Sequence, residues 1–186
     1  MSALLRNTPN ILTALRLAAS PALVALLWRG EDYAALIVFV IAGVTDALDG
    51  FLAKRFNLQT RFGRYLDPAA DKLLMLISFL ALAMLGVTPI WLTALVITRD
   101  LCIVIGIGLA YLWALPLRAT PSLLGKASTV VQVAYVGLVL LMLAFDIEAH
   151  VLKNFAEIAV AAFTVASGLG YAQLWLRAAS HSRRTA

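Results

Sequence analysis

The sequence predicts an all-α, polytopic membrane protein with six transmembrane helices. Two observations lead there: 62% of the residues are hydrophobic and only 13% are charged, whereas soluble domains carry about 25% charged residues. The apolar residues also form long blocks, each able to cross a hydrocarbon core of about 30 Å at about 1.5 Å per residue. Because these blocks are too long for barrel strands, they are predicted to be helices. The blocks span residues 11–28, 33–52, 66–85, 90–113, 123–145 and 151–176.

Turn-forming residues separate the blocks and support this division. Gly30, Gly86, Pro89, Pro116 and Pro121 lie at or near block ends, where glycine and proline interrupt helices. The 186 residues therefore form a single membrane domain, with a tail at 181–186 that we expect to be disordered. Cys102, the single cysteine, lies inside a block, and we expect it to be a small buried side chain.

Basic residues predict the orientation. Ten of the fifteen Lys and Arg residues belong to the two termini and the second and fourth loops, and two belong to the other loops. The positive-inside rule therefore places both termini, and the loop that contains Lys54 and Arg64, in the cytoplasm. The protein is expected in the inner (cytoplasmic) membrane. No nucleic-acid partner is expected, because no basic stripe with interleaved aromatic residues is present.

Four aspartates flank the basic second loop. Asp46 and Asp49 are three residues apart, and Asp67 and Asp71 are four apart, so each pair projects from one face of its helix. Carboxylates at membrane depth are costly and usually functional. Two facing pairs would offer hard oxygen ligands suited to Mg²⁺, Mn²⁺ or Ca²⁺.

The residues around these aspartates form a recognisable pattern. The chain reads Asp46-Ala-Leu-Asp49-Gly50-Phe-Leu-Ala53-Lys54, then eight residues, then Gly63-Arg-Tyr-Leu-Asp67-Pro-Ala-Ala-Asp71. This resembles the signature of the CDP-alcohol phosphotransferases, D-x-x-D-G-x-x-A-R-x8-G-x-x-x-D-x-x-x-D. One position departs, since Lys54 stands where the family usually has arginine.

The resemblance implies an enzyme that transfers a phosphatidyl group from CDP-diacylglycerol to a hydroxyl and releases CMP. It implies two divalent cations, Mg²⁺ or Mn²⁺, and a possible homodimer. In such an enzyme Asp71 would be the catalytic base and would share the metal with the other three aspartates. The positions expected to border the CDP moiety are Gly50, Ala53, Lys54 and Gly63.

The acceptor alcohol is left open between two candidates. Residues 7–16 resemble the phosphatidylglycerophosphate synthase branch, which uses glycerol 3-phosphate, whereas the Arg99-Asp100 pair resembles eukaryotic-type cardiolipin synthases, which use phosphatidylglycerol. Arg99, Lys126 and Thr129 are the candidate acceptor-binding residues, the last two on one helix face. Consecutive helical residues do not face each other, so we expect Arg99 and Asp100 to have separate partners.

An ion-coupled transporter is the alternative from another functional class, since transporters also use intramembrane carboxylates. It predicts charged residues near the midplane and an inverted repeat. The aspartates flank a single loop and no repeat is visible in the sequence, so the enzyme is the preferred interpretation.

Overall fold

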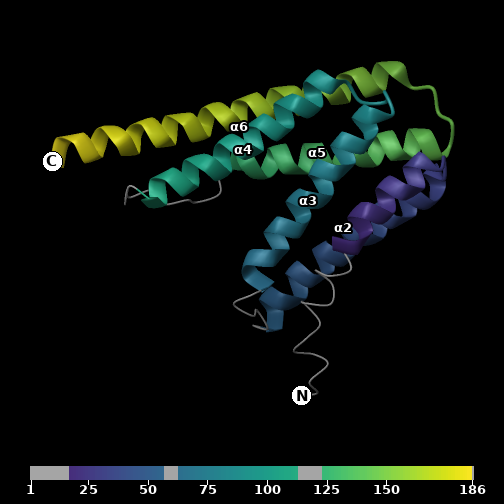
Figure 1. Cartoon of the computed structure of the whole chain (residues 1–186), viewed down its shortest axis with the longest axis horizontal. Coiled ribbons are helices and arrows are strands. Elements are labelled where there is room, and N and C mark those ends of the chain that lie inside the picture. Colours follow the sequence, from purple (N-terminus) through teal and green to yellow (C-terminus); the bar gives the residue numbers. More distant parts are fainter. Residues whose placement is uncertain (1–16, 57–62, 113–122, 186) are drawn as a thin grey trace. The chain divides into compact units, whose positions relative to one another are not determined.

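The computed structural model describes residues 17–56, 63–112 and 123–185, and all regular structure among them is helical (Figure 1). A first helix, Leu17–Trp28, precedes the labelled helices. Side chains are described except at 46–56, 63–70, 107, 110–111 and 177–185. The labelled helices are α2 (Asp32–Phe56), α3 (Gly63–Met84), α4 (Ile90–Leu112), α5 (Leu123–Ala144) and α6 (His150–Thr185).

The helix bounds lie close to the apolar blocks of the sequence, with extensions where polar residues continue a helix. α2 continues to Phe56 and α3 begins at Gly63, so both aspartate pairs are helical. α6 continues to Thr185, where the sequence suggested a disordered tail after residue 180. Residues 181–185 include two arginines and no glycine or proline, so no strong helix breaker lies in this stretch.

Three helix ends share one type of termination. Each has a residue in the left-handed region, namely Gly30 and Gly86 at φ 72° and Asp146 at φ 50°. Glycine adopts this conformation freely, and aspartate tolerates it better than most residues. The following amide then bonds back to a carbonyl of the last turn, as in a Schellman motif: Glu31 to Leu26 (2.9 Å), Val87 to Leu82 (3.0 Å) and Ile147 to Met142 (2.9 Å).

Two of the described helices are long and apolar enough to cross a membrane, Leu123–Ala144 and His150–Leu176. Leu17–Trp28 and Asp32–Thr45 are shorter apolar helices within the described residues. The all-helical class is therefore confirmed, while the prediction of six spans is supported for two helices and otherwise stays a prediction.

The chain divides into two compact units, residues 1–87 with 136–149, and residues 88–135 with 150–186. In the first unit, α2 packs against the end of α5. The buried Phe39 lies 3.6 Å from the position that a Cβ would take at Gly137. The rings of Tyr33 and Phe145 meet edge to face, with centroids 5.8 Å apart.

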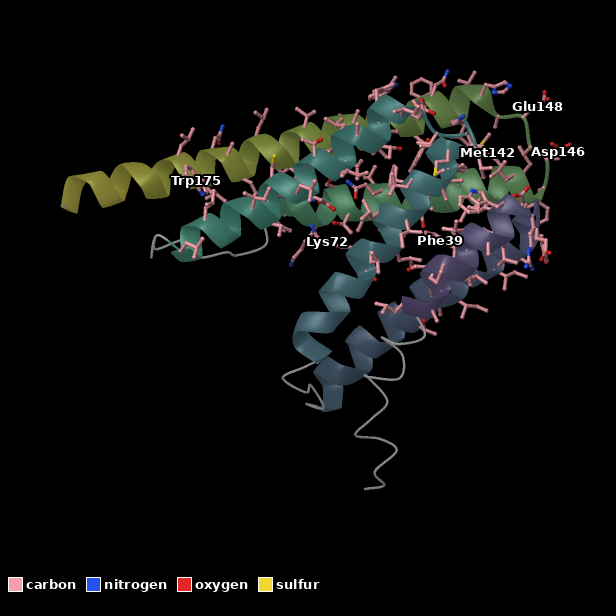
Figure 2. All side chains as sticks on the ribbon, in the orientation of Figure 1. Phe39, Lys72, Met142, Asp146, Glu148 and Trp175 are labelled. Carbon is pink, nitrogen blue, oxygen red and sulfur yellow. The ribbon has the colours of Figure 1, made fainter. Side chains whose placement is uncertain are left out.

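In the second unit, α4 and α6 lie side by side (Figure 1). Trp175 of α6 donates its indole N–H to the carbonyl of Gly106 on α4, at 3.2 Å (Figure 2). The buried Tyr135 of α5 has its hydroxyl 3.1 Å from Thr88 Oγ1 and 3.4 Å from Glu157 Oε1. Such side-chain hydrogen bonds between apolar helices fix their register.

Candidate active site

The two aspartate pairs lie on helices, as their spacing requires. Asp46 and Asp49 lie in the second half of α2, and Asp67 and Asp71 lie in the first half of α3. Each pair therefore shares one face of its helix. Asp71 is half-buried and is engaged in a polar interaction. The side chains of the other three aspartates lie outside the described side chains.

The four residues expected to border CDP are also helical. Gly50, Ala53 and Lys54 follow Asp49 on α2, and Gly63 is the first residue of α3. At 3.6 residues per turn, Gly50 and Ala53 lie on neighbouring positions of the face that carries Asp46 and Asp49. The side chains of Ala53 and Lys54 lie outside the described side chains.

The donor set is that of a hard-metal site. Among the described side chains no group of three or more His, Cys, Asp or Glu residues is close enough to hold a metal ion. Three of the four aspartates are not among those side chains, so the predicted cluster stays a prediction. Its chemistry fits Mg²⁺ or Mn²⁺, because carboxylate oxygens are the ligands these ions prefer.

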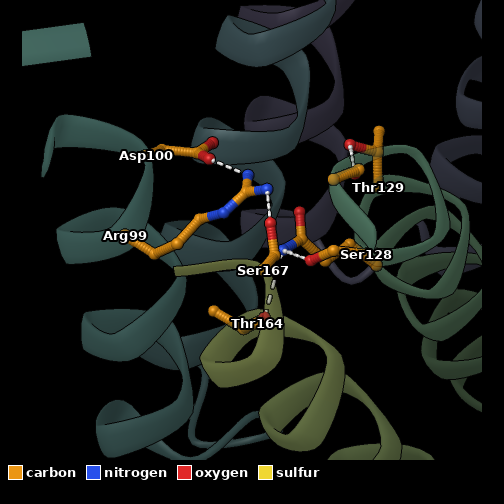
Figure 3. A network of polar contacts seen from close by, with 8 residues as sticks. Arg99, Asp100, Ser128, Thr129, Thr164 and Ser167 are labelled. Atoms are coloured by element: carbon orange, nitrogen blue, oxygen red, sulfur yellow. Dashed lines mark hydrogen bonds and ion pairs between the residues drawn. The ribbon is translucent and has the colours of Figure 1, made fainter. Parts of the chain in front are cut away.

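Arg99 occupies the polar centre of the second unit (Figure 3). Its Nη1 donates to Asp100 Oδ1 at 2.6 Å, and its Nη2 donates to Ser167 Oγ on α6. Arg99 and Asp100 therefore contact each other, contrary to the expectation from their spacing, while Arg99 also has the separate partner Ser167. The two Cβ atoms do diverge, but the long arginine side chain bends back along the helix surface and closes the gap.

Polar residues of α5 and α6 lie beside this arginine. Gln132, buried in α5, has its Nε2 3.3 Å from both Ser128 Oγ and Thr164 Oγ1 (Figure 3). Tyr171 lies with its ring centroid 6.0 Å from the Arg99 Cζ, within the range of a cation–π contact.

Sequence reasoning missed Ser167, and it assigned Tyr171 to no site. One signal was available, because Thr164, Ser167 and Tyr171 recur at helical spacing on α6 and form one polar stripe in an apolar helix. The contact between Ser167 and Arg99, which are 68 residues apart in the sequence, could not be predicted from this spacing.

A cavity of about 750 Å³ runs between α4 and α6 beside this cluster. Apolar side chains dominate its lining, and Arg99 contributes to one wall. Cys102, expected to be buried, is exposed and lines the cavity. Other lining residues are Leu95, Leu109, Leu169, Ala172 and Trp175.

The two other acceptor candidates lie at the start of α5. Lys126 and Thr129 are both exposed and three residues apart, so they share a face. The Thr129 hydroxyl donates to the carbonyl of Gly125 at 3.2 Å. Its oxygen lone pairs still leave it able to accept a hydrogen bond from a ligand.

Comparison with known families decides the class of protein. The model of the CDP-alcohol phosphatidyltransferase family matches residues 6–175, which includes both aspartate pairs and Arg99. The chain belongs to the CDP-alcohol phosphatidyltransferase family. Members of this family are membrane-integral enzymes that generally use divalent metal ions. Membership in this enzyme family favours the enzyme over the ion-coupled transporter that the sequence left as an alternative.

Individual relatives fall into two groups by acceptor. A probable phosphatidylglycerophosphate synthase of Mycobacterium tuberculosis is 36% identical, covering 97% of this chain and 87% of the relative. A CDP-diacylglycerol–glycerol-3-phosphate 3-phosphatidyltransferase of Bacillus subtilis is 31% identical, covering 89% and 93%. A CMP-forming cardiolipin synthase of Streptomyces coelicolor is 38% identical, covering 65% and 59%.

Proposed function

We propose that this phosphatidyltransferase moves the phosphatidyl group of CDP-diacylglycerol to a hydroxyl of glycerol 3-phosphate, giving phosphatidylglycerophosphate and CMP. This proposal rests on one observation: nearly the whole chain matches family members that are named for that reaction. The helical placement of the two aspartate pairs supports the same chemistry.

The four aspartates are the proposed ligands of two divalent cations, Mg²⁺ or Mn²⁺. When bound, these ions would neutralise the pyrophosphate oxygens of the donor. Gly50 and Ala53 leave the ligand-side face of α2 without large side chains, which lets the donor approach the backbone. Lys54 and Gly63 complete the proposed CDP-binding set at the facing ends of α2 and α3.

Asp71 is the proposed general base. The acceptor oxygen forms a bond to the phosphorus that carries the diacylglycerol, and the bond from that phosphorus to the CMP oxygen breaks. The hydroxyl proton passes to the Asp71 carboxylate, and CMP leaves with the electron pair. General-base catalysis of this kind contributes about 10²- to 10⁴-fold to a rate.

Arg99 is the proposed anchor of the acceptor phosphate. Its side chain is 8% exposed, it lines the cavity, and its Nε is buried without a hydrogen-bond partner in the described part of the chain. A buried N–H without a partner is costly, and a ligand oxygen would satisfy it. Lys126 and Thr129 are proposed to add to this anion site from α5.

Phosphatidylglycerol is the second candidate acceptor, which would give cardiolipin. The cavity favours it, because the lining from Leu95 to Leu109 spans about 20 Å at about 1.5 Å per residue. One leaflet of a hydrocarbon core is about 15 Å thick, so an acyl chain could lie along this cavity. Glycerol 3-phosphate has no acyl chain, so with that acceptor only the chains of CDP-diacylglycerol could lie along this wall.

The proposed setting is the inner (cytoplasmic) membrane, with six spans and with both termini and the active site in the cytoplasm. The excess of basic residues in the termini and the even-numbered loops supports this orientation. A homodimer is also proposed, on the resemblance to the family alone.

CMP release from CDP-diacylglycerol, measured with each acceptor on wild type and on Arg99→Ala, tests the proposal. With glycerol 3-phosphate, the substitution should raise KM by about 10- to 100-fold, because a charge-assisted hydrogen bond is lost. The KM for CDP-diacylglycerol should stay near the wild-type value.

With phosphatidylglycerol the effect should be smaller, since its phosphodiester carries one charge and its acyl chains add binding. Turnover with phosphatidylglycerol alone would replace the first candidate by the second. If CMP is released with neither acceptor, the proposed function itself is wrong.

A further inference from the structure

Two of the five N–H donors of Arg99 bond to side chains of the protein. Nη1 is committed to Asp100 and Nη2 to Ser167, while Nε is buried with no partner among the described residues (Figure 3). The arginine side chain is 8% exposed and that of Asp100 is 27% exposed. Arg99 lines the cavity, and the side chain of Asp100 beside it is more exposed than that of Arg99.

This contact changes the electrostatics of the acceptor site. The carboxylate 2.6 Å from the guanidinium opposes the field of Arg99 and so reduces the attraction of the arginine for an anion nearby. An approaching phosphate is attracted by Arg99 and repelled by Asp100. It binds a guanidinium that already makes a charge-assisted hydrogen bond to a carboxylate.

We infer that Asp100 is a specificity-determining residue, which competes with the acceptor phosphate for the Arg99 guanidinium. The inference rests on the proposed function, in that Arg99 is taken as the acceptor anchor. A free phosphate ion binds through its charge alone, so competition from Asp100 prevents its binding. An acceptor that also binds through its glycerol group or its acyl chains can bind despite this competition.

A purely structural role for Asp100 makes the opposite prediction. If the carboxylate only neutralises a buried cation, its removal should loosen the Arg99 geometry and weaken acceptor binding. If it competes, its removal should strengthen acceptor binding even though the protein becomes less stable. The signs of the two changes, in stability and in acceptor KM, therefore separate the two roles.

The test compares wild type with Asp100→Asn, Asp100→Glu and a control, Asp146→Asn. Asp146 is exposed in the connection between α5 and α6, and asparagine tolerates its positive φ. Acceptor KM, donor KM, inhibition by inorganic phosphate and the thermal unfolding midpoint are measured on the purified full chain in lipid–detergent micelles.

Asp100→Asn should lower the KM for glycerol 3-phosphate by about tenfold, in line with one released charge-assisted hydrogen bond. Inorganic phosphate should inhibit this variant at a concentration lower by a similar factor, while the KM for CDP-diacylglycerol stays near wild type. The unfolding midpoint should fall. Asp100→Glu, which keeps the carboxylate, and Asp146→Asn should both behave like wild type in acceptor KM. If phosphatidylglycerol is the acceptor in use, its KM should fall by less.

An unchanged or raised acceptor KM in Asp100→Asn would overturn the inference. Failure of both Asp100→Asn and Asp100→Ser to fold would also overturn it, because the carboxylate would then be a structural counter-ion. In either case wild-type CMP release would leave the proposed function standing. Loss of CMP release in the wild type with every acceptor would instead remove the proposed function.

Discussion

Arg99 is a cation buried among helices whose other contacts are mostly apolar. Such a charge is tolerated only with partners, and it has them in Asp100, Ser167 and the face of Tyr171. Two of these partners come from α6, so the arginine also joins α4 to α6. A single side chain thereby contributes both to helix packing and to the proposed acceptor site.

At the same scale, Asp71→Asn tests the division of roles among the aspartates. Asparagine keeps the shape of the side chain and removes the base, so CMP release should fall by at least about 100-fold. Binding of CDP-diacylglycerol, measured by isothermal titration, should persist. Asp49→Asn is the comparison and should weaken metal-dependent donor binding as well. Normal turnover by Asp71→Asn would mean that another group takes the proton.

Helix bounds could be predicted closely because apolar blocks and their Gly and Pro boundaries determine them. α4 was expected from 90 to 113 and spans Ile90–Leu112, and α5 was expected from 123 to 145 and spans Leu123–Ala144. Which faces meet could not be predicted, because these helices are mostly apolar and the polar stripe on α6 does not show which helix it packs against. The Trp175–Gly106 and Arg99–Ser167 contacts are of this kind.

The cavity between α4 and α6 leads to a prediction at the scale of these elements. Ala172 lines the cavity, whereas Ala162 is exposed elsewhere on α6. Ala172→Trp should fill the cavity and reduce turnover with phosphatidylglycerol by about tenfold, equivalent to about 1.4 kcal/mol. It should affect glycerol 3-phosphate little, and Ala162→Trp should affect neither acceptor. Equal loss with both acceptors in Ala172→Trp alone would mean that the cavity holds an acyl chain of the common donor, CDP-diacylglycerol, and not one of the acceptor.

For the whole molecule, the aspartate spacing was sufficient to identify the family, because carboxylates are rare in membrane helices and few chemistries need four of them. The acceptor was not identifiable in this way. The proposed acceptor site includes the Arg99–Asp100 pair within α4 and the Arg99–Ser167 contact between α4 and α6, and neither contact was predicted from the sequence.

The dependence of activity on metal ions is a prediction for the whole molecule, because the four aspartates that are proposed to bind the ions come from two helices. Excess EDTA should abolish CMP release, and added Mg²⁺ or Mn²⁺ should restore it, because hard oxygen ligands hold these ions and the donor pyrophosphate needs their charge. Zn²⁺ at an equal concentration serves as the comparison. Full activity in excess chelator would exclude the proposed two-cation site.

The orientation of the molecule in the membrane gives the last prediction. Ten of the fifteen basic residues belong to one side of the predicted topology, so that side should be cytoplasmic. In a Cys102→Ser background, Glu148→Cys lies in the α5–α6 connection (Figure 2) and Leu123→Cys lies at the opposite end of α5. A membrane-impermeant maleimide added to right-side-out vesicles should label Glu148→Cys at once and Leu123→Cys only after permeabilisation. The reverse order would place the aspartate loop outside the cell and would contradict the predicted orientation.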